Sequence, residues 1–141
     1  MTIFPTVWDV LHDGSITAVC GAIPGTVRVE VSIDYLRERF PEPGKAILVL
    51  LSGCTRFAYR EFEDSMFTTD LPAIARLKPE ILSAKTSGTL SEIDCVKGVL
   101  EVAASDCTLA LDGGRAITLD ELLSVAEAYW TEWDKRAKQK Q

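Results

Sequence analysis

The only histidine of the chain, His12, lies between two aspartates in the segment WDVLHDGSI. Imidazole titrates near neutral pH and a neighbouring carboxylate can orient it, so His12 with Asp9 or Asp13 is a candidate acid–base pair. Nucleophilic catalysis would also need a hydroxyl or thiol within reach of the ring. The candidate nucleophiles are Ser52 and Cys54 in SGCTRF, and Cys20. One hypothesis is therefore a small-ligand-binding or hydrolase-like protein with a pocket near His12 and Cys54.

The residues HDGS also have a structural interpretation. Asp13-Gly14 is typical of a tight turn, because glycine accepts positive φ and an aspartate side chain bonds to nearby backbone. His12 would then belong to a chain reversal at the edge of a sheet, where its ring bonds a carbonyl or a carboxylate. No G-x-S-x-G motif accompanies it, so we favour the structural role and assign no catalytic residue.

The cysteines do not have the spacing of a metal site. Structural zinc sites usually contain at least one close ligand pair, whereas this chain has no CxxC motif and a single histidine. We therefore expect no metal and no cofactor. Free cysteines in a reducing compartment behave as small apolar side chains, which suits Cys54 and Cys107 within strand-like segments.

A second candidate site is acidic. Glu61, Glu63 and Asp64 lie in REFEDS, a predicted loop after a strand-like segment. Such a loop is either a solvated surface or a contact for a basic protein. The chain carries −6 net charge, and without the four cations from Lys135 onward it has 11 basic and 21 acidic residues. An acidic body repels nucleic acid but steers a cationic protein partner.

Several segments have the pattern of strands. TVRVEVSI (26–33) alternates apolar and polar residues, which predicts a strand with one buried face. SITAVCGA (15–22) precedes it across a Pro-Gly turn, so the two segments predict a hairpin. KAILVLLSG (45–53) is nearly all apolar, as expected of a central strand covered on both faces. Short helices are predicted at 34–40 and 71–78.

The second half of the chain determines the predicted fold class. The β-favourable segments are EILSAKT, SEIDCVKG, VLEVAAS and CTLALD, and turn residues separate them as in a meander. One long helix follows, at about 119–136. Many strands followed by one helix favour an α+β fold, a mainly antiparallel meander or curved sheet with the C-terminal helix packed on it. We expect a single domain spanning residues 1–141.

The predicted C-terminal helix has clear signals. Thr118 and Glu121 have the spacing of a capping box. Apolar residues recur at helical spacing and form one stripe, which contains Leu119, Leu122, Leu123, Ala126, Trp130 and Trp133. Aromatic residues at this spacing usually belong to the core, but Trp130 and Trp133, with Tyr129, are also candidates to line a ligand pocket or an interface, including one with a second copy. We expect Trp133 and either Tyr129 or Trp130 to be partly exposed. The basic tail from about residue 135 is expected to fray.

The N-terminal region carries a resemblance. The matching residues are Leu11, His12, Asp13, Gly14, Ile16 and Val19, followed by Val27, Val29, Val31 and Ile33. They resemble the LHD(G/S)-x-I pattern of small uncharacterised bacterial proteins, some of which are grouped with immunity proteins of polymorphic toxin systems. The resemblance covers about the first quarter of the chain. It implies a stoichiometric binder rather than an enzyme and supplies no catalytic residues.

The N-terminus lacks a basic segment followed by an apolar one, and the longest apolar run, Ala46–Leu51, is too short to span a bilayer. We therefore expect a cytoplasmic protein that does not bind membranes. The leading hypothesis is a small protein-binding module, including an immunity-type inhibitor, and an enzyme is the less favoured hypothesis. The candidate binding residues are His12, Asp13, Glu61, Glu63, Asp64 and Trp133.

Overall fold

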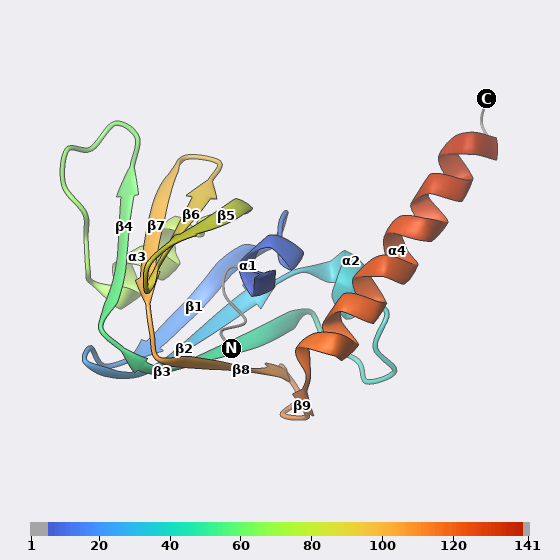
Figure 1. The fold of residues 1–141 in the computed structure, drawn as a ribbon, viewed down its shortest axis with the longest axis horizontal. Coiled ribbons are helices and arrows are strands. Elements are labelled where there is room, and N and C mark those ends of the chain that lie inside the picture. Colours follow the sequence, from blue (N-terminus) through green and yellow to red (C-terminus); the bar gives the residue numbers. More distant parts are fainter. Residues whose placement is uncertain (1–5, 140–141) are drawn as a thin grey trace.

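The computed structural model describes residues 6–139 and has the predicted α+β architecture (Figure 1). Within this range nine strands form two antiparallel sheets. The larger sheet has the order β1 (Ser15–Gly21), β2 (Gly25–Ser32), β3 (Ala46–Cys54), β8 (Asp106–Leu111) and β9 (Ala116–Ile117). The smaller sheet has the order β4 (Arg56–Glu61), β7 (Gly98–Ala103), β6 (Leu90–Cys95) and β5 (Ile81–Ser87).

The larger sheet confirms the predicted hairpin and the predicted central strand. β1 pairs with β2, and β3 lies between β2 and β8. Direct cross-strand partners form one buried row, which consists of Val19, Val29, Val49 and Leu109. Because β3 is buried along most of its length, its sequence is a continuous apolar run and lacks the alternation seen in β2.

The chain crosses between the sheets at two adjacent places. β3 leads into β4 through Thr55, and β7 leads into β8 through residues 104–105. The Thr55 amide donates to the Ala103 carbonyl at 2.8 Å, and the Ser105 amide donates to the Ser52 carbonyl at 2.9 Å. Of the four segments in the predicted meander, β5, β6 and β7 pair with one another in the smaller sheet. The fourth, β8, pairs with β3 in the larger sheet. Buried residues of both sheets form one core.

Short helices cover the strands. The helix α1 (Thr6–Val10) contacts β5, and α3 (Leu71–Leu77) contacts β1. The predicted helix at 71–78 is confirmed, and Asp70 caps it by accepting the Ala73 amide at 3.3 Å. The helix α2 (Asp34–Arg37) is shorter than the predicted 34–40, and its N-cap is Ile33, whose side chain makes no capping hydrogen bond.

The long helix α4 (Leu119–Gln139) begins with the predicted capping box. The Glu121 amide donates to Thr118 Oγ1 at 3.1 Å, and the Thr118 amide donates to Glu121 Oε1 at 3.3 Å. Leu122 and Ala126 are buried in the core, whereas the C-terminal half of α4 projects beyond the sheets (Figure 1). The helical backbone extends past residue 135 to Gln139. No helix in residues 6–139 is long and apolar enough to cross a membrane.

Candidate functional site

The turn between α1 and β1 positions His12. Asp13, and not Gly14, has positive φ, 70°, and its amide donates to the Ile81 carbonyl at 2.7 Å. Gly14 is needed for space, because a Cβ there would lie 2.7 Å from Val31 Cγ1 and 2.9 Å from the Leu11 carbonyl oxygen. These contacts hold the turn against both sheets. The sequence predicted positive φ for the glycine, whereas Asp13 has it and Gly14 is required for its small size.

The predicted carboxylate partner of His12 is absent among the hydrogen bonds of the described residues. His12 Nδ1 lies 2.8 Å from the backbone carbonyl oxygen of Asp9. The Asp9 carboxylate accepts the amide of Ala84 at 2.7 Å instead and so satisfies a backbone donor at the outer edge of β5. The Asp13 side chain is exposed. The geometry therefore matches the structural role of His12 in a chain reversal.

The imidazole of His12 stacks on the indole of Trp130 in α4. Their ring centroids lie 5.4 Å apart and their planes differ by 17°. Tyr35, in α2, donates its hydroxyl to the His12 carbonyl at 2.7 Å. Burial, with the charge of Asp13 adding to it, raises the pKa of Tyr35 above its ordinary value, so this phenol remains a donor. Three segments distant in the sequence meet at this point.

The aromatic contacts continue outward along α4. The Tyr35 and Tyr129 centroids lie 4.6 Å apart, and the Trp130 and Trp133 rings meet edge to face at 5.9 Å and 68°. Trp130 is 37% exposed and Trp133 is 52% exposed, which confirms the predicted exposure. We call His12, Tyr35, Tyr129, Trp130 and Trp133 the aromatic surface.

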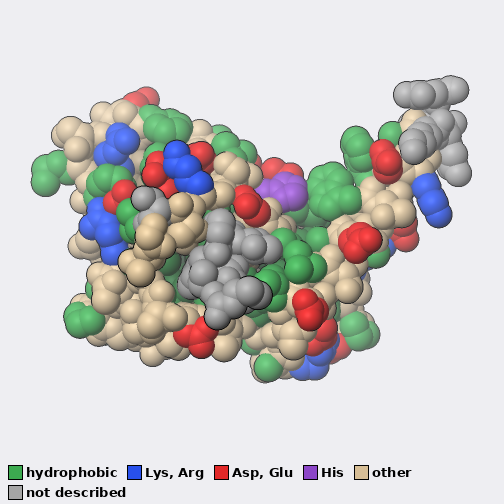
Figure 2. Space-filling model, in the orientation of Figure 1, with side chains coloured by type: hydrophobic (Ala, Val, Ile, Leu, Met, Phe, Trp, Pro, Cys, Tyr) green, Lys and Arg blue, Asp and Glu red, His purple; other side chains and the backbone are tan. Residues whose placement is uncertain are grey.

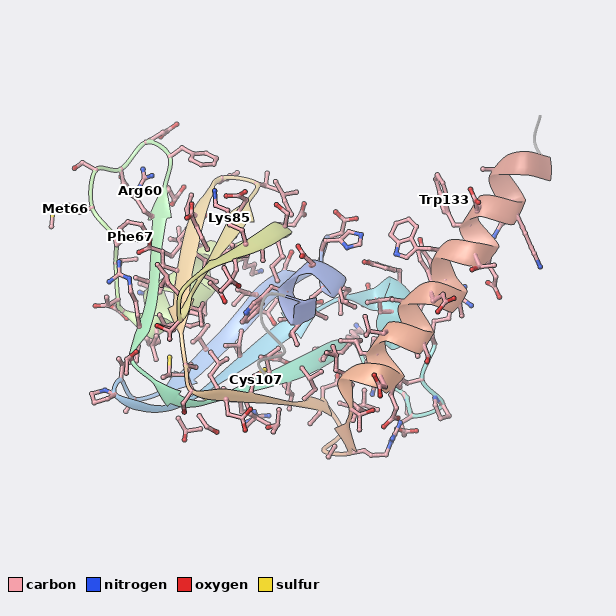
Figure 3. The ribbon with its side chains drawn as sticks, viewed as in Figure 1. Arg60, Met66, Phe67, Lys85, Cys107 and Trp133 are labelled. Atoms are coloured by element: carbon pink, nitrogen blue, oxygen red, sulfur yellow. The ribbon has the colours of Figure 1, made fainter. Side chains whose placement is uncertain are left out.

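Figures 2 and 3 show where the aromatic surface lies on the molecule. Figure 2 shows the histidine beside hydrophobic side chains of the projecting helix, with acidic side chains next to it. Figure 3 shows Trp133 on the side of α4 that faces back across the molecule, in the half that projects from the body. Arg39 strengthens the attachment of α4, because its guanidinium lies 5.5 Å from the Tyr129 ring centroid and pairs with Glu132.

The acidic candidate residues lie elsewhere, in the segment Glu61–Met66, which we call the acidic loop. Glu61 is the last residue of β4, where it pairs with Gly98, so the predicted loop begins one residue later, at Phe62. Phe62 and Met66 in this loop are 60% and 78% exposed. Glu63 and Asp64 are exposed and Glu61 is half-buried. In the part of the chain that the structure describes, none of these three carboxylates forms an ion pair.

Backbone and cation contacts hold the base of the acidic loop. Tyr59 and Thr68 exchange two backbone hydrogen bonds of 3.0 and 2.8 Å. Arg60 donates to the Asp64 carbonyl at 3.1 Å, and the guanidinium groups of Arg60 and Arg56 lie 5.5 and 5.1 Å from the Phe67 ring centroid. Figure 3 shows Met66 pointing away from the body at the opposite end from Trp133. The structure therefore divides the predicted residues between two surfaces.

The pocket hypothesis for His12 and Cys54 gains no support. Cys54 is fully buried, its thiol donates to the Arg56 carbonyl at 3.4 Å, and burial raises its pKa. Three hollows of about 180, 390 and 450 Å³ are lined by other residues than these two. In residues 6–139, no cluster of three or more His, Cys, Asp or Glu side chains is arranged to hold a metal ion.

No protein-family model matches the chain, and neither a curated protein nor a solved structure matches it significantly. A function for this chain must therefore be inferred from the aromatic surface and the acidic loop themselves.

Sequence reasoning did not identify Tyr35 as part of the aromatic surface, or Arg39 as the residue that attaches α4 beside it. Both belong to the region of α2, which is a single turn long and too short to show an apolar period. An aromatic and a cation four residues apart in DYLRERF were the only available signal. Such a pair is common on solvated helices, so it could not indicate that α4 packs there.

Proposed function

We propose that this protein works by binding another protein through its aromatic surface. The observation that carries the proposal is the exposure of Trp133, 52%, on a half of α4 that projects beyond the sheets. Exposed aromatic clusters are typical of protein-binding sites, in which tryptophan and tyrosine contribute most of the binding energy.

The surface is also organised in advance of binding. The stack on His12 and the Tyr35 hydrogen bond hold the turn, while the Arg39 contacts hold α4. A surface that is already ordered loses little conformational entropy when a partner binds. Trp133 can therefore present its ring without rearrangement of the residues beneath it.

The finer form of the proposal is a cytoplasmic bacterial inhibitor of immunity type with a basic partner. It is supported by the resemblance of the LHDG segment and by the net charge of −6. Asp9 and Asp13 are exposed beside the aromatic surface, so a cationic partner would be attracted to the same place. No observation favours the hydrolase-like alternative, in which Cys54 would have to be reached by a substrate.

Partner capture from the organism's own lysate tests the proposal. The tagged wild type, Trp133→Ala and Leu123→Ala are compared at low and moderate salt, with mass spectrometry of the captured proteins. Leu123 is the matched control, because it is 37% exposed on the same helix but lies two turns before Trp130. We expect wild type and Leu123→Ala to capture the same stoichiometric partner, and Trp133→Ala to lose it. Equal capture by Trp133→Ala would refute the proposal.

A further inference from the structure

We propose that, in the isolated protein, the aromatic surface is occupied by a second copy of this chain, whose acidic loop docks against the projecting half of α4. The result is a dimer with two equivalent contacts. This inference rests on the proposed function, because it names an occupant for the same surface. It also assigns a role to the acidic loop, which the proposed function leaves unused.

The apolar parts of the two surfaces complement each other. The projecting half of α4 presents Trp130 and Trp133 at an edge-to-face angle. The acidic loop presents Phe62 and Met66, and Met66 is the most exposed of the large hydrophobic side chains in the described range. Thioether and aromatic side chains pack well against indole rings, so the contact would cover the most exposed apolar groups at both ends.

The charges also complement each other at the C-terminal end of α4, from Lys135 onward, which lies beyond the point where Trp130 meets His12 between Asp9 and Asp13. Residues 61–70 contain four acidic residues and no basic one, whereas the tail from Lys135 contains four basic residues and no acidic one. Among the described residues, Lys135 and the carboxylates of Glu61, Glu63 and Asp64 form no ion pair, although the charge of Lys135 contributes to the lowered pKa of Glu132. Arg60 lies nearby but bonds the Asp64 backbone carbonyl rather than a carboxylate. The loop therefore keeps its negative charge available to a basic group.

The arrangement of the fold requires that the two surfaces come from different copies. Figure 1 places the acidic loop, after β4, and the C-terminal end of α4 at opposite ends of the molecule, so they cannot meet within one chain. Both project from the same side of the body. A two-fold rotation about an axis beyond that side, perpendicular to the view, brings each α4 to the loop of the other copy. Such an arrangement is closed and does not propagate into a filament.

Light scattering of size-separated protein over a wide concentration range tests the oligomeric state. We expect a monomer–dimer equilibrium that shifts toward monomer as salt rises, because salt screens exposed charges. A monomer at every concentration overturns the inference, and so does an assembly without a defined size.

Single substitutions then test the apolar contact. We expect Trp133→Ala to raise the dimer Kd by about 30-fold or more, as is usual when a tryptophan hot spot is truncated. Met66→Ala, in the loop, should weaken the same dimer, whereas Leu123→Ala should leave Kd unchanged. Circular dichroism of each variant checks that it is folded. A dimer that tolerates both Trp133→Ala and Met66→Ala is built on another surface.

A charge exchange tests the pairing of loop and helix. Glu63→Lys and Lys135→Glu should each weaken the dimer, because each brings like charges together across both contacts. The double variant Glu63→Lys/Lys135→Glu should regain the dimer, since opposite charges face each other again. No recovery in the folded double variant would overturn the proposed pairing.

The results separate this inference from the proposed function. A wild type that stays monomeric but loses a captured partner on Trp133→Ala overturns the inference and supports the proposed function. Trp133→Ala without effect on either dimerisation or capture overturns both.

Discussion

The guanidinium of Arg37 lies 2.8 Å from the carboxylate of Asp112, although the Arg37 side chain is fully buried. Arg37 also donates to the backbone carbonyls of Glu42, at 2.6 Å, and Pro43, at 2.9 Å. The other Asp112 oxygen accepts the amides of Lys45, at 2.9 Å, and Ala46, at 3.1 Å. Arg37 of α2 and Asp112, directly after β8, thus hold the backbone of the loop that leads into β3.

Removal of Asp112 should therefore destabilise the fold. We expect Asp112→Ala to lower the free energy of unfolding by about 3 kcal/mol, because it leaves a buried arginine without its counterion. The value lies at the low end of the usual range since Arg37 keeps two carbonyl acceptors. Urea denaturation measures the loss. Glu42→Ala is the control, because it removes only an exposed carboxylate paired with Arg115 and should cost much less. Equal losses of unfolding free energy in the two variants would show that the buried Arg37–Asp112 pair contributes no more stability than the exposed Arg115–Glu42 pair.

The same pair predicts a pH dependence. Burial opposes ionisation of Asp112, but the Lys45 amide, the Arg37 guanidinium and the Ala46 amide outweigh it, so the pKa of Asp112 lies below its ordinary value. A lowered pKa in the folded state contributes stability above the unfolded pKa of about 3.9, and that contribution is lost as pH falls through the folded pKa. We expect the stability difference between wild type and Asp112→Asn to shrink below about pH 4. Urea midpoints over a pH series measure it, and a constant difference contradicts the assignment.

Gly14 should be intolerant of a side chain. We expect Gly14→Ala to cost about 1–3 kcal/mol of unfolding free energy, because its Cβ would press on Val31 and on the Leu11 carbonyl. Gly113→Ala is the matched control, since nothing lies within 4 Å of a Cβ there, and we expect a change within about 0.5 kcal/mol. Thermal or urea unfolding of both variants decides the matter. Similar unfolding free energies of the two variants would mean that the turn can shift to accommodate a methyl group at position 14, and would contradict the prediction.

The capping box at the start of α4 should contribute measurably to stability. We expect Thr118→Ala to lower the unfolding free energy by about 1 kcal/mol, because the Glu121 amide loses the hydroxyl acceptor that caps it. Thr131→Ala, at an exposed position within the same helix, should be neutral or slightly stabilising since alanine is the better helix former. Chemical denaturation compares them, and the reverse order of stabilities would count against the cap.

His12 should be more important for stability than for binding. We expect His12→Ala to lower the unfolding free energy by about 1 kcal/mol through loss of the stack on Trp130. A double-mutant cycle with Trp130→Ala should give a coupling of about 0.5–1.5 kcal/mol. Partner binding should fall far less than in Trp133→Ala. A His12→Ala variant that folds normally yet loses all binding would show that the imidazole itself is functional.

The four thiols should differ in reactivity. Cys20 is exposed, whereas Cys54, Cys95 and Cys107 are buried. Burial raises the pKa of Cys95 and of Cys107 to about 12, and the neighbouring Asp94 and Asp106 add to this effect. Titration with a thiol reagent should therefore detect one fast cysteine in the folded protein and four in urea. Fast reaction of a second thiol in the folded state would indicate that the core opens.

Features that depend on neighbours along the chain could be predicted from the sequence. The alternation in 26–33 and the Pro-Gly turn before it predicted the β1–β2 hairpin, and the apolar run at 45–53 predicted the central position of β3. The spacing of Thr118 and Glu121 predicted the cap of α4. These patterns are informative because a strand repeats every two residues and a helix every 3.6, so nearby residues show which face is buried.

Local patterns were less informative where a distant residue determined the conformation. The helix predicted at 34–40 ends at Arg37, whose buried side chain pairs with Asp112, 75 residues further along the chain. In the DG turn, positive φ falls on Asp13, and Gly14 is needed for its small size because it packs directly against Val31 of β2. In both places the sequence contained suitable residues, but long-range packing decided how they were used.

The sequence by itself determined the α+β class, the β1–β2 hairpin and the apolar stripe of α4, because each is encoded by residues close together in the chain. Only the tertiary structure decided that the strands divide into two sheets, that His12 meets Trp130, and that Arg37 meets Asp112. It also decided that the sheets support only the first half of the stripe and leave Trp133 exposed. An apolar residue type favours burial against any apolar surface, so the choice of surface depends on how the whole chain packs.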